Sequence, residues 1–231
     1  MVFNDIYDMT QEENIFCAKR TLVDAVYKAA NLEGIAVTFA QTTDIINNIN
    51  VASLTPTEIN KVCCLKDGWE YLLNNLNKPL DLVFLEELHE IVARFDVPYS
   101  YLGKLRTEDV IISGTSWRPT LPNADLIHSE LLNKANIPCI TERAIKTGLW
   151  LMKTQPFKDG NKRIGSFAIN KILIENGKGL FNVAVEKDGI FKELLVKYYE
   201  DDDLDLLTSW CFENCLEGTT KANNLKKNKS L

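Results

Sequence analysis

The residues best suited to chemistry lie in one polar stretch, which reads TQPFKDGNKR from residue 154 to residue 163. Gly160 tolerates unusual backbone angles and precedes a predicted helix start, where unpaired N–H groups and the helix dipole favour an anion. Asp159 offers a hard oxygen ligand for Mg²⁺, and Arg163 can grip a phosphate with two parallel hydrogen bonds. Asn161 and Lys162 add donors. The stretch predicts a phosphate cradle, although it would also suit a plain turn in which Asp159 and Asn161 are caps and Arg163 is solvated.

Two segments with helical periodicity flank this loop and must position it. Upstream, Ile145, Leu149 and Met152 recur on one helical face. Downstream, residues 164–174 are apolar almost all round, which is typical of a helix at the centre of a bundle. The loop is therefore predicted to join two packed central helices.

The loop resembles the signature of the Fic family, whose pattern is His-Pro-Phe-x-(Asp/Glu)-Gly-Asn-(Gly/Lys)-Arg between two central helices. Each position from Pro156 to Arg163 fits this pattern, whereas Gln155 replaces the His. The flanking residues 103–106 and 110–114 resemble the stretch that leads into the target-docking flap of such proteins. The resemblance covers roughly residues 80 to 216. It implies the Fic fold, an all-α bundle with a short β-hairpin flap.

The resemblance also implies an activity, in which a hydroxyl side chain of a protein target attacks the α-phosphate of ATP. AMP would be transferred to the target and pyrophosphate released. The implied ligands are ATP and Mg²⁺, with the metal on Asp159 and the nucleotide on Gly160, Asn161, Lys162 and Arg163. The sequence defines neither the target nor the oligomeric state.

Three positions depart from the AMP-transferring pattern. In the family, the His takes the proton of the target hydroxyl, but Gln155 is an amide that accepts no proton at neutral pH. The resemblance thus implies Asn161 and Arg163 as catalytic residues, with Gln155 in the place of the His. Lys162 replaces the commoner glycine, as in the Doc branch, where the resemblance implies phosphate transfer. Ser166 stands where many members have a second Arg. Three functions stay open: a weakened or lost AMP transferase, an inactive nucleotide-binding pseudoenzyme, and a Doc-like protein kinase.

A second motif lies at the end of a predicted N-terminal helix. Residues 29–34 read AANLEG and resemble the family's inhibitory motif, (Ser/Thr)-x-x-x-Glu-(Gly/Asn), in which Glu33 and Gly34 match and Ala29 replaces the hydroxyl residue. In the family that Glu enters the nucleotide site and pairs with the second Arg. Because Ser166 replaces that Arg, either Glu33 pairs with Arg163 or Lys162 instead, or the inhibitory motif is vestigial. The alternative is that Glu33 is a surface charge at a helix end.

The helical period fails between Tyr99 and Pro122, where the flap is expected. The run at residues 110–112 is β-branched, and the following residues include Gly114 and two prolines, so a short strand and hairpin are predicted. Ile112, Ser113 and Gly114 would form the part of the flap that faces the site. An edge strand of this kind can pair with an extended peptide.

Composition limits the remaining classes. The 231 residues carry a net charge of −6, which argues against a nucleic-acid surface. No apolar run reaches membrane-spanning length and no signal peptide is evident, so a cytoplasmic protein that binds no membrane is expected. The six cysteines lack metal-ligand spacing and are predicted to be free thiols. We expect an N-terminal helical region with the inhibitory helix (1–79), a Fic core (80–217) and a disordered basic tail (218–231).

Overall fold

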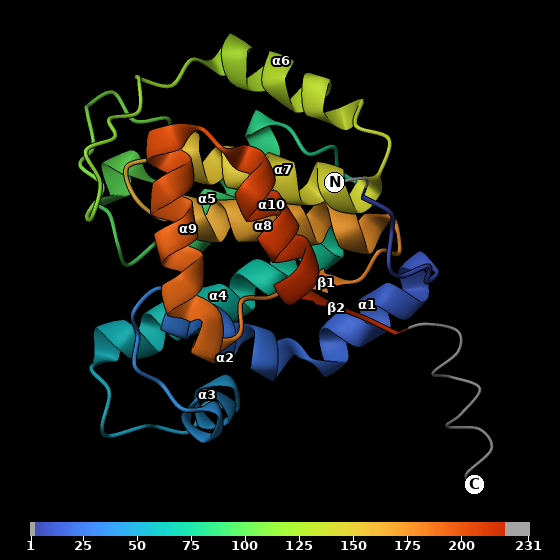
Figure 1. Ribbon diagram of the computed structural model, residues 1–231. Coiled ribbons are helices and arrows are strands. Elements are labelled where there is room, and N and C mark those ends of the chain that lie inside the picture. Colours follow the sequence, from blue (N-terminus) through green and yellow to red (C-terminus); the bar gives the residue numbers. More distant parts are fainter. Residues whose placement is uncertain (1–2, 220–231) are drawn as a thin grey trace, which may run out of the picture.

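Helices make up most of the computed structural model, which describes residues 3–219 (Figure 1). The helices are α1 (Gln11–Arg20), α2 (Leu22–Leu32), α3 (Phe39–Ile46), α4 (Pro56–Asn74), α5 (Leu82–Val92), α6 (Ala124–Ala135), α7 (Ile140–Thr154), α8 (Asn161–Glu175), α9 (Asp188–Asp201) and α10 (Leu204–Asn214). Two short 3₁₀ turns, η1 (Tyr99–Tyr101) and η2 (Val185–Lys187), and two strands, β1 (Leu180–Phe181) and β2 (Leu216–Glu217), complete the described part. The predicted fold class, mainly helical with a small amount of β structure, is confirmed.

Local capping chemistry sets where the long helix α4 begins. The Thr55 hydroxyl accepts the Glu58 N–H at 3.2 Å, and the Glu58 carboxylate accepts the Thr55 N–H at 2.8 Å. Pro56 occupies the first helical position, where its missing N–H costs nothing. The sequence TPTE at residues 55–58 therefore fixes the start of α4.

Helices α7 and α8 form the centre of the molecule, with α4 and α2 on one side and α9 and α10 on another (Figure 1). They approach closely because glycines face each other at the crossing. A Cβ built on Gly148 would lie 2.4 Å from the Gly165 carbonyl oxygen, and one on Gly165 would lie 2.5 Å from the Gly148 oxygen. Helix α8 is buried almost all round, as its apolar sequence predicts.

The hydrophobic core extends from the N-terminal helices into the central pair. Ala18, Val26 and Val62 belong to the same buried cluster as Ile164 and Phe167 of α8. The N-terminal helices therefore share a core with the signature helices. The division at residue 79 stays a prediction. Of the predicted disordered tail, residues 220–231 lie outside the described part of the chain.

The predicted hairpin at residues 110–121 is wrong: the segment from Val110 to Pro122 contains no strand. Pro119 and Pro122 lack N–H donors, and the Pro119 and Thr120 carbonyls accept hydrogen bonds from the Arg106 side chain instead of from a strand. The segment is an irregular loop with a turn at Ser113 and Gly114. The one strand pair among residues 3–219 is elsewhere: β1 and β2 run antiparallel, with Leu180 opposite Glu217 and Phe181 opposite Leu216.

Two further expectations concern membranes and cysteines. Among residues 3–219, none of the helices combines the length and apolar character that crossing a bilayer requires. All six cysteines are free thiols, as predicted.

The glycine crossing of α7 and α8 gives the first prediction. Gly148→Ala should lower the free energy of unfolding by about 1–3 kcal/mol, because the added methyl group meets backbone that cannot yield. Gly189→Ala is the control, since Gly189 also lies in a helix and an added Cβ there meets no atom within 4 Å. Urea denaturation of both variants measures the difference. Equal stability of the two variants would contradict the close crossing.

Candidate functional site

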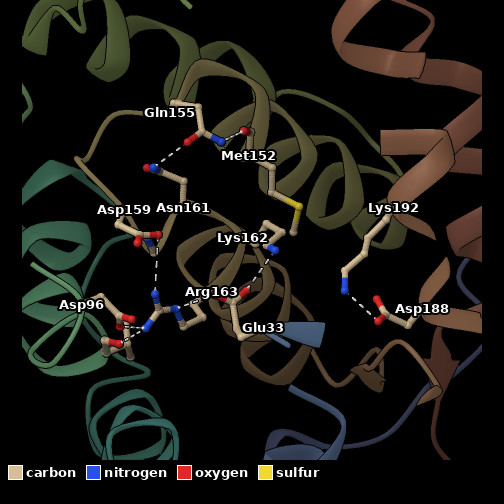
Figure 2. A network of polar contacts seen from close by, with 12 residues as sticks. Glu33, Asp96, Met152, Gln155, Asp159, Asn161, Lys162, Arg163, Asp188 and Lys192 are labelled. Atoms are coloured by element: carbon tan, nitrogen blue, oxygen red, sulfur yellow. Dashed lines mark hydrogen bonds and ion pairs between the residues drawn. The ribbon is translucent and has the colours of Figure 1, made fainter. Parts of the chain in front are cut away.

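The signature loop begins where Gln155 ends α7 in the left-handed conformation, with φ of 50°. Its side-chain Nε2 donates to the Met152 carbonyl at 2.6 Å, and its Oε1 accepts a hydrogen bond from Asn161 Nδ2 at 2.8 Å (Figure 2). Both polar ends of the amide are thus used within the loop and its two helices. Gln155 therefore ties the end of α7 to the start of α8.

Asn161 holds the rest of the loop in a closed turn. Its Oδ1 accepts the Phe157 N–H and its Nδ2 donates to the Phe157 carbonyl, both at 2.9 Å. The Asn161 side chain is buried and its donors are used by Phe157 and Gln155. What Asn161 offers to a ligand is therefore its backbone N–H, at the first position of α8.

Gly160 directs the chain into α8, with φ of 77° in the left-handed region. Its N–H donates to Asp159 Oδ1 at 2.5 Å. The N–H groups of Asn161, Lys162 and Arg163 lie in the first turn of α8, where an α-helix supplies no partner for them. The positive end of the dipole of α8 points to the same place, so this turn favours an anion.

Arg163 lies at the centre of a charged cluster, with a side chain only 6% exposed (Figure 2). Its Nη1 donates to Asp96 and to the Val92 carbonyl at the end of α5. Its Nε lies 3.2 Å from Glu33 Oε2, and its Nη2 lies 3.8 Å from Asp159 Oδ1. Burial opposes the positive charge, but Glu33 and Asp96 outweigh it, so the pKa of Arg163 is raised.

Glu33, at the end of α2, lies close to both cations with which the sequence analysis pairs it, Arg163 and Lys162. Besides Arg163, its Oε1 approaches Lys162 Nζ at 3.6 Å (Figure 2). The alternative of a free surface charge does not apply, since the Glu33 side chain is 15% exposed. Its regulatory role stays a prediction.

Two cavities meet at this cluster. The first, of about 480 Å³, lies between the signature loop, the flap segment and α9. It is lined by Glu33, Val110, Ile111, Ile112, Ser113, Gln155, Lys158, Asp159, Gly160, Asn161, Lys162, Lys192, Leu195, Val196 and Tyr199. The second, of about 280 Å³, shares Glu33, Asp159 and Lys162 with it and reaches α4 and the end of α5. The first has the size of a small-molecule site.

The flap segment borders the first cavity although it is not a hairpin. Ile112 and Ser113 line the cavity, and Gly114 follows in the turn with φ of 83°. Arg106 anchors the base of the segment: its guanidinium donates to the carbonyls of Glu108, Pro119 and Thr120, and its Nε donates to the Gln155 carbonyl at 2.7 Å. One buried arginine thus fixes the flap relative to the signature loop.

His89, on α5, packs against the signature loop. Its position on an apolar helical face in the sequence did not reveal this role. Its ring stacks on Phe157 with centroids 4.1 Å apart. Nε2 lies 3.1 Å from the Asp159 carbonyl oxygen, and Nδ1 accepts the Gly103 N–H at 3.0 Å. Burial lowers the pKa of His89 from 6.5 to about 4, so the ring is neutral near pH 7.

Helix α9 supplies further residues to the site. Lys192 and Tyr199 line the first cavity, and the Tyr199 hydroxyl donates to the Met152 carbonyl at 3.0 Å. Lys192 pairs with Asp188 at 2.8 Å (Figure 2). The apolar residues Ile190, Leu194, Leu195 and Tyr198 predict a helix here. No local signal places it over the signature loop.

A magnesium ion would fit Asp159. The carboxylate is 58% exposed beside the first turn of α8, and Oδ1 already accepts the Gly160 N–H. Among residues 3–219, no group of three or more His, Cys, Asp or Glu side chains is arranged to hold a metal. Such a one-carboxylate site suits Mg²⁺, which completes its shell with phosphate oxygens and water.

Comparisons with known proteins agree with this arrangement. Residues 79–173 match the model of the Fic/DOC family. No curated protein matches the chain.

Solved structures share the fold at low sequence identity. A Fic domain-containing signaling protein from Bacteroides thetaiotaomicron has 16% identity and a TM-score of 0.73, covering 89% of this chain and 87% of that chain. Fic-1 of C. elegans (134–508) has 19% identity and a TM-score of 0.75, covering 86% of this chain and 62% of that chain. A Fic family protein from Desulfovibrio desulfuricans has 19% identity and a TM-score of 0.67, covering 88% and 62%. These likenesses establish the fold.

The buried His89 gives a prediction of pH dependence. Its folded pKa of about 4 lies below the unfolded value of 6.5, so between these pH values the unfolded chain binds more protons. Stability from this group should be complete above pH 6.5 and decline by roughly 3 kcal/mol as the pH falls to 4. Urea denaturation from pH 4 to 7 should show a shallower slope for His89→Gln than for the native sequence.

His128→Gln is the matched control, because His128 is exposed and should leave the slope unchanged. The chain has only two histidines, so this variant also isolates the NMR titration of His89. A midpoint near 6.5 would contradict the buried, neutral ring.

Proposed function

From the match of residues 79–173 to the Fic/DOC family model, we propose that the protein binds Mg²⁺–ATP and transfers AMP to a hydroxyl side chain of a target protein. The observation that carries the proposal is the cavity of about 480 Å³ onto which the first turn of α8 opens. Lys158, Lys162 and Lys192 line this cavity together with the flap segment, so a polyanion and an extended target segment can meet there.

Each residue of the cradle has a specific part in this reaction. The N–H groups of the first turn of α8 bind phosphate oxygens, and Lys162 neutralises their charge. Asp159 would hold Mg²⁺, which neutralises further phosphate charge when bound. Arg163, held by Asp96, stabilises the charge that develops on the leaving pyrophosphate. Positioning and charge neutralisation thus account for most of the catalysis.

Two features keep the proposed activity low. Neither histidine of the chain lines the cavity, and Gln155 accepts no proton at neutral pH. A missing general base lowers the rate by about 10²–10⁴-fold. Glu33 also occupies the cation cluster, where it competes with phosphate for Lys162 and Arg163.

The second candidate is a nucleotide-binding protein without transferase activity. It is favoured by the hydrogen bonds that Gln155 makes to Met152 and Asn161, which engage both ends of the amide within the protein. Lys162 in the signature favours a third outcome, phosphate transfer in the manner of the Doc branch. Labelled nucleotides separate the three, as described below.

Nucleotide binding is tested first. Arg163→Ala should weaken the binding of Mg²⁺–ATP by roughly 10–100-fold, because charge-assisted hydrogen bonds to phosphate are lost. Glu33→Gly should strengthen it, because the competing carboxylate is removed. Arg20→Ala, an exposed arginine in the last turn of α1, is the control and should leave the affinity unchanged. Isothermal titration calorimetry measures all four proteins, and circular dichroism checks that each is folded. Equal affinity in the folded Arg163→Ala variant would refute the site.

Chemistry is tested by restoring the base. Gln155→His provides a group that titrates near neutrality, at a left-handed position that His tolerates better than most residues. Incorporation from α-labelled ATP should rise little in this variant and strongly when Glu33→Gly is added. The two effects should be non-additive because both act on one site.

Label position decides between the candidate functions. Label from the α-phosphate indicates AMP transfer, and label only from the γ-phosphate indicates a kinase. No label in the double variant, with ATP binding preserved, would favour the inactive nucleotide-binding protein.

A further inference from the structure

A third cavity, of about 270 Å³, lies between the end of α5 and the turn that follows η1. It is lined by Glu90, Arg94, Tyr99, Leu102 and Lys104. None of these residues lines the two cavities at the signature loop, and the proposed reaction uses none of them. The cavity is therefore a candidate for a separate binding site.

Two cations line this cavity without a partner of their own. Within the described part of the chain, no carboxylate lies at ion-pair distance from the side chain of Arg94 or Lys104, and neither side chain donates a hydrogen bond. Lys158, in contrast, pairs with Glu108 at 2.5 Å. The guanidinium and the ammonium group in the third cavity therefore keep all their N–H donors for a ligand.

The carboxylate in the lining does not neutralise both cations. Glu90 lies against the turn at Gly103, where an added Cβ would meet Glu90 Oε1 at 2.6 Å. Together with Arg94 and Lys104 it leaves the lining with a net positive charge. An anion complements such a cavity, and an arginine binds a carboxylate well because it can donate two parallel hydrogen bonds.

Exposed aromatic and aliphatic side chains give the cavity an apolar part. Tyr99 is 89% exposed, it belongs to neither hydrophobic core cluster, and Leu102 lines the cavity with it. Phe95, next to Arg94 in the chain, is also 44% exposed. Tyr and Arg are among the residue types that are enriched at protein interfaces. This combination favours a protein segment over a bare inorganic anion.

The chain leads directly from this cavity to the flap segment. Lys104 lines the third cavity and Val110 lines the first, and the chain between them holds their Cα atoms at most about 22 Å apart. Tyr101, in η1, lies close to Lys158 of the first cavity, with Nζ 5.5 Å from the ring centroid. One extended target segment of about seven residues is therefore long enough to reach both cavities.

We propose that the third cavity is a docking site for an acidic segment of the target protein, in which Arg94 and Lys104 bind a carboxylate side chain and Tyr99 packs against its neighbour. The proposal rests on the protein modification proposed above. It makes Arg94 and Lys104 specificity residues, which select targets that have Asp or Glu within about seven residues of the modified hydroxyl.

Fluorescence polarisation with synthetic peptides tests this site without a nucleotide. The Glu probe is a labelled peptide in which Glu-Leu-Glu runs stand about six residues before and after a serine, and the Gln probe has Gln in place of every Glu. Arg94→Gln combined with Lys104→Met should weaken binding of the Glu probe roughly tenfold, because charge-assisted hydrogen bonds are lost. The Gln probe should bind the native protein no better than it binds this variant.

The matched control is Lys19→Met combined with Arg20→Gln, which removes the same two charges from the end of α1. Both side chains are exposed, both lack an ion-pair partner among residues 3–219, and neither lines the third cavity. The affinity for the Glu probe should stay unchanged. NMR spectra then locate the probe, which should shift the backbone amide of Gly103 in the turn beside the cavity.

Several results would overturn the docking site. Equal loss of affinity in the two double variants would mean that the probe responds to net charge alone. Equal binding of the Glu and Gln probes, no binding of the Glu probe, or no shift at Gly103 would each remove the site. Tighter binding of a single-stranded oligouridine than of the Glu probe, dependent on Arg94 and Lys104, would assign the cavity to nucleic acid instead.

The same probes separate this proposal from the proposed function. If the Glu probe binds in an Arg94-dependent way but α-labelled ATP marks no protein or peptide, the docking site stands and AMP transfer fails. If Gln155→His combined with Glu33→Gly transfers AMP to both probes at equal rates, and Arg94→Gln changes neither rate, AMP transfer stands and the docking site fails.

Discussion

The buried guanidinium of Arg163 is the constraint on which the rest of the structure depends. A buried charge must be paired, and the partners of Arg163 come from three separate elements. Glu33 lies at the end of α2, Asp96 and the Val92 carbonyl at the end of α5, and Asp159 in the signature loop. The N-terminal helix α2 is therefore coupled to α8 through charge as well as through the shared hydrophobic core.

The two main carboxylate partners of Arg163, Asp96 and Glu33, are bound to it differently. Asp96 is hydrogen-bonded to the guanidinium and also paired with Lys61, and these contacts orient Arg163. Glu33 lies 3.2 Å from Nε without a hydrogen bond. In the proposed function, phosphate oxygens would replace the Glu33 carboxylate, while Asp96 would keep the guanidinium in place.

Local sequence signals were sufficient where the structure depends on neighbours in the chain, as at the capping box of Thr55 and the turn at Gly160. The same kind of signal stands at Thr38, which caps α3 together with Gln41. The flap was mispredicted because its carbonyls bond to the side chain of Arg106 rather than to a strand. Lys61 and Asp96 carry no local signal, since only the packing of α4 against α5 brings them together.

The signature loop and the charged cluster around Arg163 have different physical origins. Gly160 and Asn161 have folding reasons for their identity, since Gly160 allows a left-handed turn and the Asn161 side chain closes it, so they do not by themselves indicate a ligand. The charged cluster is different. Buried ion pairs can often be replaced by apolar residues without loss of stability, and an ion pair with unbonded polar atoms adds a penalty. Arg163 facing Glu33 is therefore poorly explained by folding alone, which favours the proposed binding of an anion in place of Glu33.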